Sequence, residues 1–305
     1  MGARVRPMDA PRQTVVRPKL EIDVRMSLSA MRHGPRDPTV RTRDGAVWRA
    51  TRTADGAATV CYEQRGAEVL VSAWGPGADH ALAGAPDVLG ARDSLDGWDP
   101  SHHRLVKELD RRMSGLRMVA TWKVFEVIVP TVLEQKVTSV EAHESWRRLA
   151  WAWGEEAPGP GEVRLGPSPA KLAGEPYYRF HRFGLESKRV DIVRRLADRV
   201  VRLEEACTLG RARLEAFPGI GVWTSAKVAQ VCWADADAVA VRDYHLPSIV
   251  VYGLTGKRGG DDDAMLELLE PYRPHRGRAA RLLKFGSGAP PRRAPRAPIR
   301  DFAGI

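Results

Sequence analysis

The residues most able to do chemistry lie in the stretch FPGIGVWTSA at positions 217–226. Pro218 fixes its own φ and ends the preceding helix, while Gly219 and Gly221 allow positive φ or a close approach of the backbone to a ligand. Ile220 can fill the gap between the two helices. A helix that restarts directly after the break leaves outward backbone N–H groups, so the pattern predicts a hairpin that holds a phosphate. Taken alone, Pro-Gly-x-Gly more often marks an ordinary tight turn.

One acidic residue, Asp243, follows twenty residues after Trp223 and opens the segment DYHLPSIVVYG. Asp is favoured at a helix N-cap, and Pro247 falls in the first turn of the helix expected there. A carboxylate at a helix N-terminus is held ionised by the dipole and by backbone donors. Such a group could stabilise the positive charge that develops on a sugar when a glycosidic bond breaks. Helix capping alone would also account for Asp243.

At the hairpin and the acid, the sequence resembles the helix–hairpin–helix DNA glycosylase superfamily, and within it the bacterial 3-methyladenine DNA glycosylase II (AlkA-type) branch. The resemblance covers roughly residues 20–286, and it includes the segments EQKVTS, VAVRDYHL and PYRPHRGRAARLL in the family's order. It implies a monofunctional DNA glycosylase that flips alkylated purines of the 3-methyladenine type out of double-stranded DNA. The enzyme would hydrolyse the N-glycosidic bond, a step of base-excision repair.

Carried over residue by residue, the resemblance gives Asp243 the position of the catalytic aspartate. The DNA-binding hairpin falls on Gly219, Gly221 and Thr224, where some family members hold a monovalent cation on backbone carbonyls. No other cofactor and no further metal are expected. Trp223 stands where lyase-active glycosylases carry a Schiff-base lysine, which implies a monofunctional enzyme, and it matches an aromatic residue of the base pocket.

The remaining predicted contacts concern the flipped base and the DNA around it. Tyr244 is predicted to stack with Trp223 on an electron-poor base, a cation–π preference that favours alkylated purines. Lys227 stands where the branch has a pocket aromatic, and Lys284-Phe285 stands where it has a tryptophan, so the stacking wall is weaker here.

The segment EQKVTS supplies two further predicted DNA contacts. Gln135 matches a polar residue of the branch, and Lys136 stands at the position of an apolar wedge, for which a lysine is a poor replacement. Arg276 in the late segment PYRPHRG is predicted to face DNA or to brace Asp243.

Composition and charge restrict the class of protein. The 305 residues are 43% hydrophobic and 28% charged, which is typical of a soluble protein with room for two domains. The net charge of +10 suits a polyanionic partner such as nucleic acid, although a solvated basic surface is an equal interpretation.

The cysteines and the N-terminus indicate an intracellular protein. Cys61, Cys207 and Cys232 have no CxxC spacing, which excludes a zinc ribbon, a four-cysteine iron–sulfur cluster and a paired disulfide framework. We find neither a secretory signal nor an apolar run long enough to span a bilayer. We therefore expect a monomer without membrane contact, cytoplasmic and nucleoid-associated.

The sequence patterns of the elements that must position these residues predict an α+β fold class, and they divide the chain into four segments. They are a disordered basic arm (1–19), an antiparallel β-sheet domain with a covering helix (20–100), an all-α helix–hairpin–helix glycosylase domain (101–286) and a Pro/Arg-rich tail (287–305). The sheet is indicated by AVWRATR, ATVCYEQR and AEVLVSAW, which are separated by the turn signals Asp55-Gly56 and Arg65-Gly66. The covering helix is expected over 78–89.

Beyond residue 100 the hydrophobic period becomes helical. Between 122 and 153, Pro130 either kinks one helix or marks the start of another, and 157–169 is predicted as a loop. Further helices are expected over 187–203, 209–217, 222–234, 244–253, 263–271 and 276–285.

Two other functions fit parts of the pattern. A non-catalytic helix–hairpin–helix DNA-binding protein would use the hairpin only to hold the backbone. A glycosylase for oxidised bases with lyase activity through Lys227 is disfavoured by Trp223.

Overall fold

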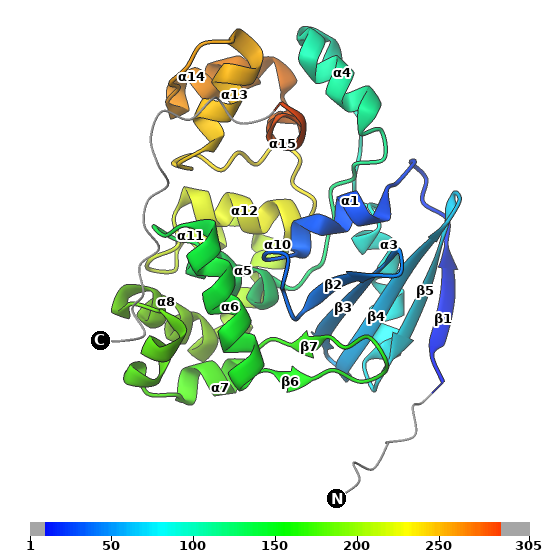
Figure 1. Ribbon diagram of the computed structural model, residues 1–305, viewed down its shortest axis with the longest axis vertical. Helices are drawn as coiled ribbons and strands as arrows, with labels where there is room; N and C mark the ends of the chain where they lie inside the picture. The colour runs from blue at the N-terminus through cyan, green and yellow to red at the C-terminus, as the bar shows by residue number, and fades with distance from the viewer. Residues whose placement is uncertain (1–9, 288–305) are drawn as a thin grey trace, which may run out of the picture.

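The computed structural model describes residues 10–287 of the chain. An antiparallel sheet forms the N-terminal part, and helices from the rest of the chain pack against and beside it (Figure 1). Residues 1–9 of the predicted arm and 288–305 of the predicted tail lie outside the described residues.

The five-stranded sheet has the strand order β1-β5-β4-β3-β2, and every neighbouring pair is antiparallel. Gly56 and Gly66 have positive φ at two of its hairpins, which confirms the predicted turns. The strands are β1 (Arg12–Val16), β2 (Val40–Arg43), β3 (Ala46–Thr53), β4 (Gly56–Arg65) and β5 (Glu68–Trp74).

The prediction of a disordered arm over 1–19 is wrong for β1, which pairs with β5 so that Val15 lies opposite Leu70. Thr14, Val15 and Val16 are β-formers, and Val16 packs against the core. An average over the surrounding Arg and Pro residues hides this short run.

Short helices line the sheet. They are α1 (Val24–Leu28) with the 3-10 turn η1 (Ser29–Met31), α2 (Ala78–Ala83) and α3 (Ala85–Val88). The helix predicted over 78–89 is thus two helices separated at Gly84. Helix α2 contacts β4 and β5, so the expected cover over the sheet is present (Figure 1).

The helical part contains two neighbouring groups of helices. The first contains α5 (Val124–Leu133), α6 (Ser139–Trp153), α7 (Pro169–Gly174), α8 (Ser187–Asp198), α9 (Val200–Glu204), α10 (Ala206–Leu209) and α11 (Arg211–Glu215). The second contains α4 (Arg104–Arg112), α13 (Leu246–Thr255), α14 (Asp262–Leu269) and α15 (Arg276–Gly286), and α12 (Val222–Cys232) has residues in the cores of both groups. Three further 3-10 turns are η2 (Pro100–His102), η3 (Tyr177–Phe183) and η4 (Glu270–Tyr272).

Pro130 does not end its helix, because α5 continues through it to Leu133. The next helix begins at Ser139, where Thr138 and Glu141 form a capping box. The loop between them, residues 134–138, therefore carries the predicted DNA contacts. The predicted loop 157–169 contains β7 (Arg164–Leu165), which pairs with β6 (Glu155–Glu156). Strands of two residues are too short to be predicted from the sequence.

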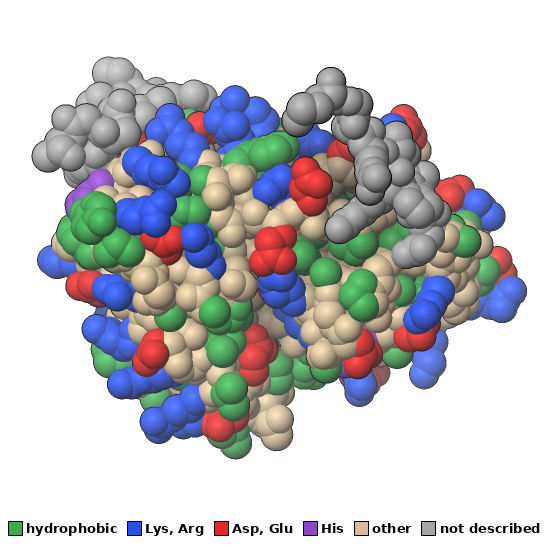
Figure 2. All heavy atoms as spheres, turned by 90° about the horizontal axis from the view of Figure 1, so that it is seen from below, with side chains coloured by type: hydrophobic (Ala, Val, Ile, Leu, Met, Phe, Trp, Pro, Cys, Tyr) green, Lys and Arg blue, Asp and Glu red, His purple; other side chains and the backbone are tan. Residues whose placement is uncertain are grey.

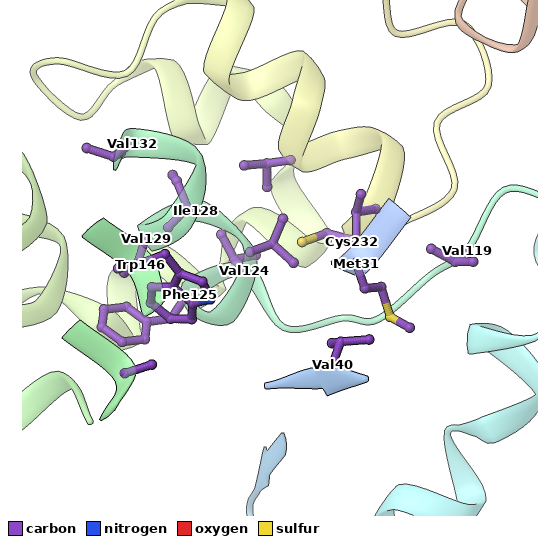
Figure 3. Packing of buried hydrophobic residues seen from close by; sticks show 14 of the residues in the cluster. Met31, Val40, Val119, Val124, Phe125, Ile128, Val129, Val132, Trp146 and Cys232 are labelled. Carbon is purple, nitrogen blue, oxygen red and sulfur yellow. The ribbon is translucent and has the colours of Figure 1, made fainter. Parts of the chain in front are cut away.

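Helix α12 is central to the packing. Val228 and Cys232 belong to a hydrophobic cluster shared with the sheet and α5, whereas Ala226 and Ala229 belong to a second cluster with α13 and α15. Figure 3 shows part of the first cluster, which includes Met31 from the N-terminal part and Cys232 from α12. Because α12 starts at the predicted hairpin, that hairpin is held between the two groups of helices. No helix within residues 10–287 is long and apolar enough to cross a membrane.

Candidate active site

The predicted hairpin is present between α11 and α12. Gly219 has φ +93°, and a Cβ placed there would lie 2.5 Å from the side chain of Ile192, so this position needs glycine. Ile220 is buried and fills the space between the helices. Gly221 is the N-cap of α12, and no side chain within the described residues caps this end. The first-turn N–H groups are therefore available to an anion.

Gln135 ties the loop 134–138 to the hairpin. Its Nε2 donates hydrogen bonds to the carbonyl oxygen of Gly219, at 3.1 Å, and to Oγ1 of Thr224, at 2.9 Å. The side chains of Gln135 and Thr224 are thus hydrogen-bonded to each other, and Thr224 is buried. Their contacts with DNA stay predictions. Lys136, in the middle of this loop, has φ +57° and is exposed, as a surface contact requires of its side chain.

The hairpin carbonyls have protein donors. The carbonyl oxygen of Pro218 accepts a hydrogen bond from Arg195 Nη1 at 3.1 Å, and that of Gly219 accepts from Gln135. A monovalent cation at the hairpin stays a prediction, and it would have to compete with these donors or use other carbonyl oxygens.

Asp243 lies in the loop before α13 and contacts the first turn of α12. Its Oδ2 accepts a hydrogen bond from Trp223 Nε1 at 2.9 Å, and its Oδ1 accepts from the backbone N–H groups of His245 and Leu246, both at 2.9 Å. The helix itself begins at Leu246 with His245 as N-cap, so Asp243 is not the N-cap residue that the sequence suggested. Its carboxylate nevertheless performs the capping, because two backbone donors of that terminus bind it.

These contacts keep Asp243 ionised. Burial tends to raise the pKa of its carboxyl, but the hydrogen bond from Trp223, the two backbone donors and the charge of Lys284 outweigh burial and lower the pKa. The pKa of Lys284 is itself lowered, first by desolvation and then by repulsion from Lys227, against the attraction of Asp243. The result is an anionic group at a fixed place beside the hairpin helix.

An ion pair beside Trp223 was not foreseen from the sequence. Lys227 Nζ lies 2.8 Å from Glu134 Oε2 and 5.2 Å from the centroid of the Trp223 ring. His33, from the loop that precedes β2, contacts the other oxygen of Glu134 at 3.1 Å. Burial would raise the pKa of Glu134, but Lys227 and His33 hold it well below its usual range. The one sequence signal was the place of Lys227, one turn after Trp223.

Two predicted site residues lie apart from this arrangement. Tyr244 is 90% exposed and packs only against the ring of the neighbouring His245 among the described ring contacts, so it does not form a stacking wall with Trp223. Arg276 braces Asp237 with two hydrogen bonds, of 2.9 and 2.6 Å, and does not reach Asp243. Both of its outer nitrogens are held by acids, and its contact with DNA stays a prediction.

A cavity lies elsewhere in the molecule. It measures about 410 Å³ and lies between the sheet and α5, where its lining includes Arg49, Glu126 and His33 but not Asp243. Asp243 is instead half-buried at the surface beside α12. The site is therefore reached from outside the molecule, as a reaction on a polymer requires.

No protein-family model matches the chain, and no curated protein matches it in sequence. Among solved structures, the 3-methyladenine DNA glycosylase from Archaeoglobus fulgidus superposes with a TM-score of 0.74 at 18% identity, over 90% of this chain and 98% of that one. The 8-oxoguanine glycosylase/lyase from Clostridium acetobutylicum in its apo form gives 0.69 at 13% identity, over 91% and 98%. The same enzyme in complex with double-stranded DNA gives 0.68 at 13% identity, over 90% and 96%.

The fold is therefore that of the DNA glycosylases. The structural neighbours of this chain are helix–hairpin–helix DNA glycosylases, of the 3-methyladenine and the 8-oxoguanine types, which confirms the resemblance seen in the sequence. At identities of 13–18% the likeness establishes the fold, and the activity must be argued from the site.

Proposed function

We propose that this protein is a monofunctional DNA glycosylase that excises alkylated purines from double-stranded DNA in base-excision repair. The observation that carries the proposal is the ionised carboxylate of Asp243, fixed by Trp223 to the helix that begins at the hairpin. A phosphate grip and an oriented anion thus share one helix terminus. Both lie in a fold shared with enzymes named as DNA glycosylases.

DNA binding in this proposal starts at the hairpin. The free N–H groups after Gly221 hold one backbone phosphate, and the net charge of +10 adds attraction that does not depend on sequence. On the face shown in Figure 2, basic side chains are interspersed with acidic ones and form no single basic field. The hairpin contact, rather than a charged patch on that face, would set the position of the DNA. We expect a monomer to suffice.

Bond cleavage follows from the charge of Asp243. As the bond between C1′ and the base nitrogen breaks, its electron pair stays with the base and positive charge develops on the deoxyribose. The carboxylate stabilises this charge, and such electrostatic effects are worth several kcal/mol. A water oxygen then bonds to C1′, and its proton passes to Asp243 or to solvent. An N-alkylated cationic purine leaves as a neutral base and needs no acid.

Trp223 supports the monofunctional assignment. Its indole N–H is occupied by Asp243, and an indole is not a nucleophile that could form a Schiff base with the sugar. Water is then the attacking group, which leaves an abasic site with an intact strand.

Base release from DNA tests the proposal. Duplex DNA treated with a methylating agent should release methylated purines, measured by mass spectrometry, and the strand should stay uncut until heated in alkali. Asp243→Asn should lower the release rate by roughly 10²–10³-fold, as loss of a single electrostatic group does. Asp44→Asn, the same change at a carboxylate 88% exposed at the end of the sheet, is the matched surface control.

Two results would count against the proposal. Full activity of Asp243→Asn would remove the assigned role of the carboxylate. Tight, salt-sensitive DNA binding without release of any base would favour a non-catalytic helix–hairpin–helix DNA-binding protein.

A further inference from the structure

The indole ring of Trp223 contacts two groups of opposite charge, a carboxylate at its edge and an ammonium group over its face. The edge of Trp223 donates its hydrogen bond to Asp243 at 2.9 Å, while the ammonium group of Lys227 lies over the ring, 5.2 Å from its centroid. Lys227 is one turn further along α12 and is half-buried. A base whose sugar faces Asp243 would therefore have Lys227 as a neighbour.

Glu134 fixes the position of this ammonium group. Its Oε2 lies 2.8 Å from Lys227 Nζ, and its other oxygen contacts His33 at 3.1 Å. Its side chain is only 15% exposed, so water screens the pair weakly. Paired with a carboxylate, the lysine is a hydrogen-bond donor and not the free amine that attack on a sugar requires.

The other charged groups around Lys227 leave this assignment intact. Lys284 on α15 and His143 on α6 are near enough to interact with it electrostatically, and burial lowers the pKa of the His143 ring, which favours its neutral form. Lys284 interacts with Asp243 as well, but within residues 10–287 only Lys227 lies over the Trp223 ring.

We propose that Lys227 donates a hydrogen bond, and then its proton, to the departing base, which extends excision to neutral purine lesions at the expense of cationic ones. The inference rests on the proposed glycosylase function. The bond from C1′ to the base breaks, the base keeps the electron pair and takes the proton of Lys227, and water adds to C1′. The proton that the water loses returns to the lysine amine through solvent, so the net reaction is hydrolysis.

The selectivity follows from charge. A neutral purine would leave as an anion unless a donor protonates it, and a positioned acid contributes typically 10²–10⁴-fold to such a step. A base with a fixed positive charge gains nothing from the donor and is repelled by it. The cation–π position over Trp223 is also already taken by Lys227, so a cationic base finds no attraction there.

Single-turnover base release from two matched duplexes tests the inference, one with 1,N6-ethenoadenine (neutral) and one with 7-methylguanine (cationic) at the same place. Lys227→Met should lower release of ethenoadenine about 100-fold while release of 7-methylguanine is unchanged or faster. Lys227→Arg, which keeps the charge, should restore part of the activity on the neutral base. Lys107→Met, the same change on the exposed face of α4, is the control and should leave the ratio of the two rates unchanged.

Several outcomes would overturn it. Equal losses on both bases in a folded Lys227→Met protein would show a structural role, and no loss on either would show that Lys227 does not act on the base. A covalent DNA complex trapped by borohydride in the wild type and absent in Lys227→Met would make the lysine a nucleophile. Failure of the wild type to release either base would refute the proposed function itself, which is a different result.

Discussion

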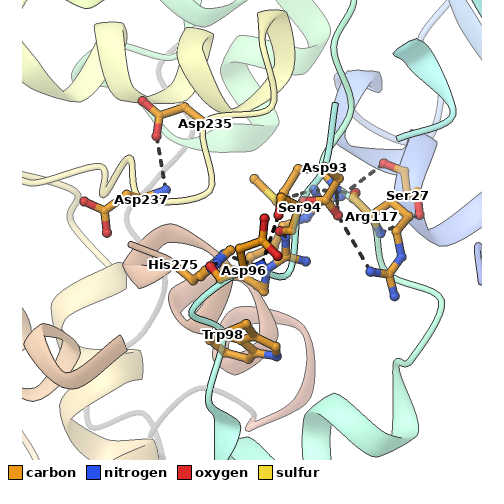
Figure 4. A network of polar contacts seen from close by, with 12 residues as sticks. Ser27, Asp93, Ser94, Asp96, Trp98, Arg117, Asp235, Asp237 and His275 are labelled. Atoms are coloured by element: carbon orange, nitrogen blue, oxygen red, sulfur yellow. Dashed lines mark hydrogen bonds and ion pairs between the residues drawn. The ribbon is translucent and has the colours of Figure 1, made fainter. Parts of the chain in front are cut away.

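Two aspartates of this protein, Asp93 and Asp243, are both held by several donors, but by donors of different charge. The side chain of Asp93 is completely buried and contacts the guanidinium groups of Arg278 and Arg117, the latter at 3.7 Å (Figure 4). Its Oδ2 also accepts a hydrogen bond from the backbone N–H of Met118 at 3.1 Å. This cluster joins the loop after α3 to α15 and to the segment before α5.

Asp243 is held by neutral donors instead. An indole N–H and two backbone N–H groups orient it, and no lysine or arginine within residues 10–287 forms an ion pair with it. Arginines around Asp93 cancel the charge of that carboxylate, whereas neutral donors fix the direction of Asp243 and leave its negative charge available to a ligand. The comparison shows that the charge of the donors, more than their number, separates a carboxylate that holds the fold together from one suited to chemistry.

The largest effect expected from this comparison is on stability, at Asp93. Asp93→Asn leaves the buried charges of Arg278 and Arg117 without their carboxylate, and breaking a buried pair in this way costs about 3–5 kcal/mol. Urea unfolding followed by circular dichroism would measure it. Asp79→Asn, at a carboxylate 71% exposed, is the matched control and should cost about 1 kcal/mol or less.

The same unfolding experiment on Asp243→Asn would contradict this difference between the two aspartates if its loss of stability equalled that of Asp93→Asn. It would mean that the neutral donors, too, serve mainly to hold the fold together.

A smaller effect is expected at Trp223. Trp223→Phe removes the hydrogen bond that favours the ionised form of Asp243, so the pKa of this carboxyl should rise. Because the ionised form is the active one, the acid limb of the pH–rate profile for base release should move to higher pH, while the rate near neutrality, where the carboxyl is ionised in both proteins, should change by less than about tenfold. An acid limb at the wild-type position would show that the indole N–H does not tune Asp243.

The smallest effect is expected at Tyr244, the aromatic neighbour of Asp243. Since its side chain is 90% exposed, Tyr244→Ala should change stability by less than about 0.5 kcal/mol and leave base release near the wild-type rate. A large loss of release with unchanged stability would show that Tyr244 turns onto the base when DNA binds, as the sequence had suggested.

Local patterns predicted much of this molecule. Turn glycines marked the hairpins of the sheet, and Pro218 with Gly219 marked the break before α12, because such residues restrict the backbone wherever they occur. Strand β1 was missed because five residues are too few to stand out within a stretch rich in Arg and Pro. Most helices after residue 100 were found with ends displaced by one or two residues, such as the start of α13 at Leu246. The helices α4 and α7 were missed, and the single helix expected over 187–203 is two helices, α8 and α9.

Contacts between residues far apart in the sequence could be predicted less well. The sequence proposed Asp243 and Trp223 separately, and only the fold shows that they share a hydrogen bond. Arg276 was expected to face DNA or to brace Asp243, and the register of α15 places it against Asp237. The sequence also gave no reason to join Glu134 to Lys227, because they are ninety-three residues apart and meet only when α5 packs on α12.

The bridge between Glu134 and Lys227 has a consequence for how such a protein can evolve. A descendant that replaced Lys227 with an aromatic residue, to hold a different base, would leave the largely buried carboxylate of Glu134 without its cation. The two positions are therefore expected to change together, and the residue types found there in a relative would indicate which bases it can hold.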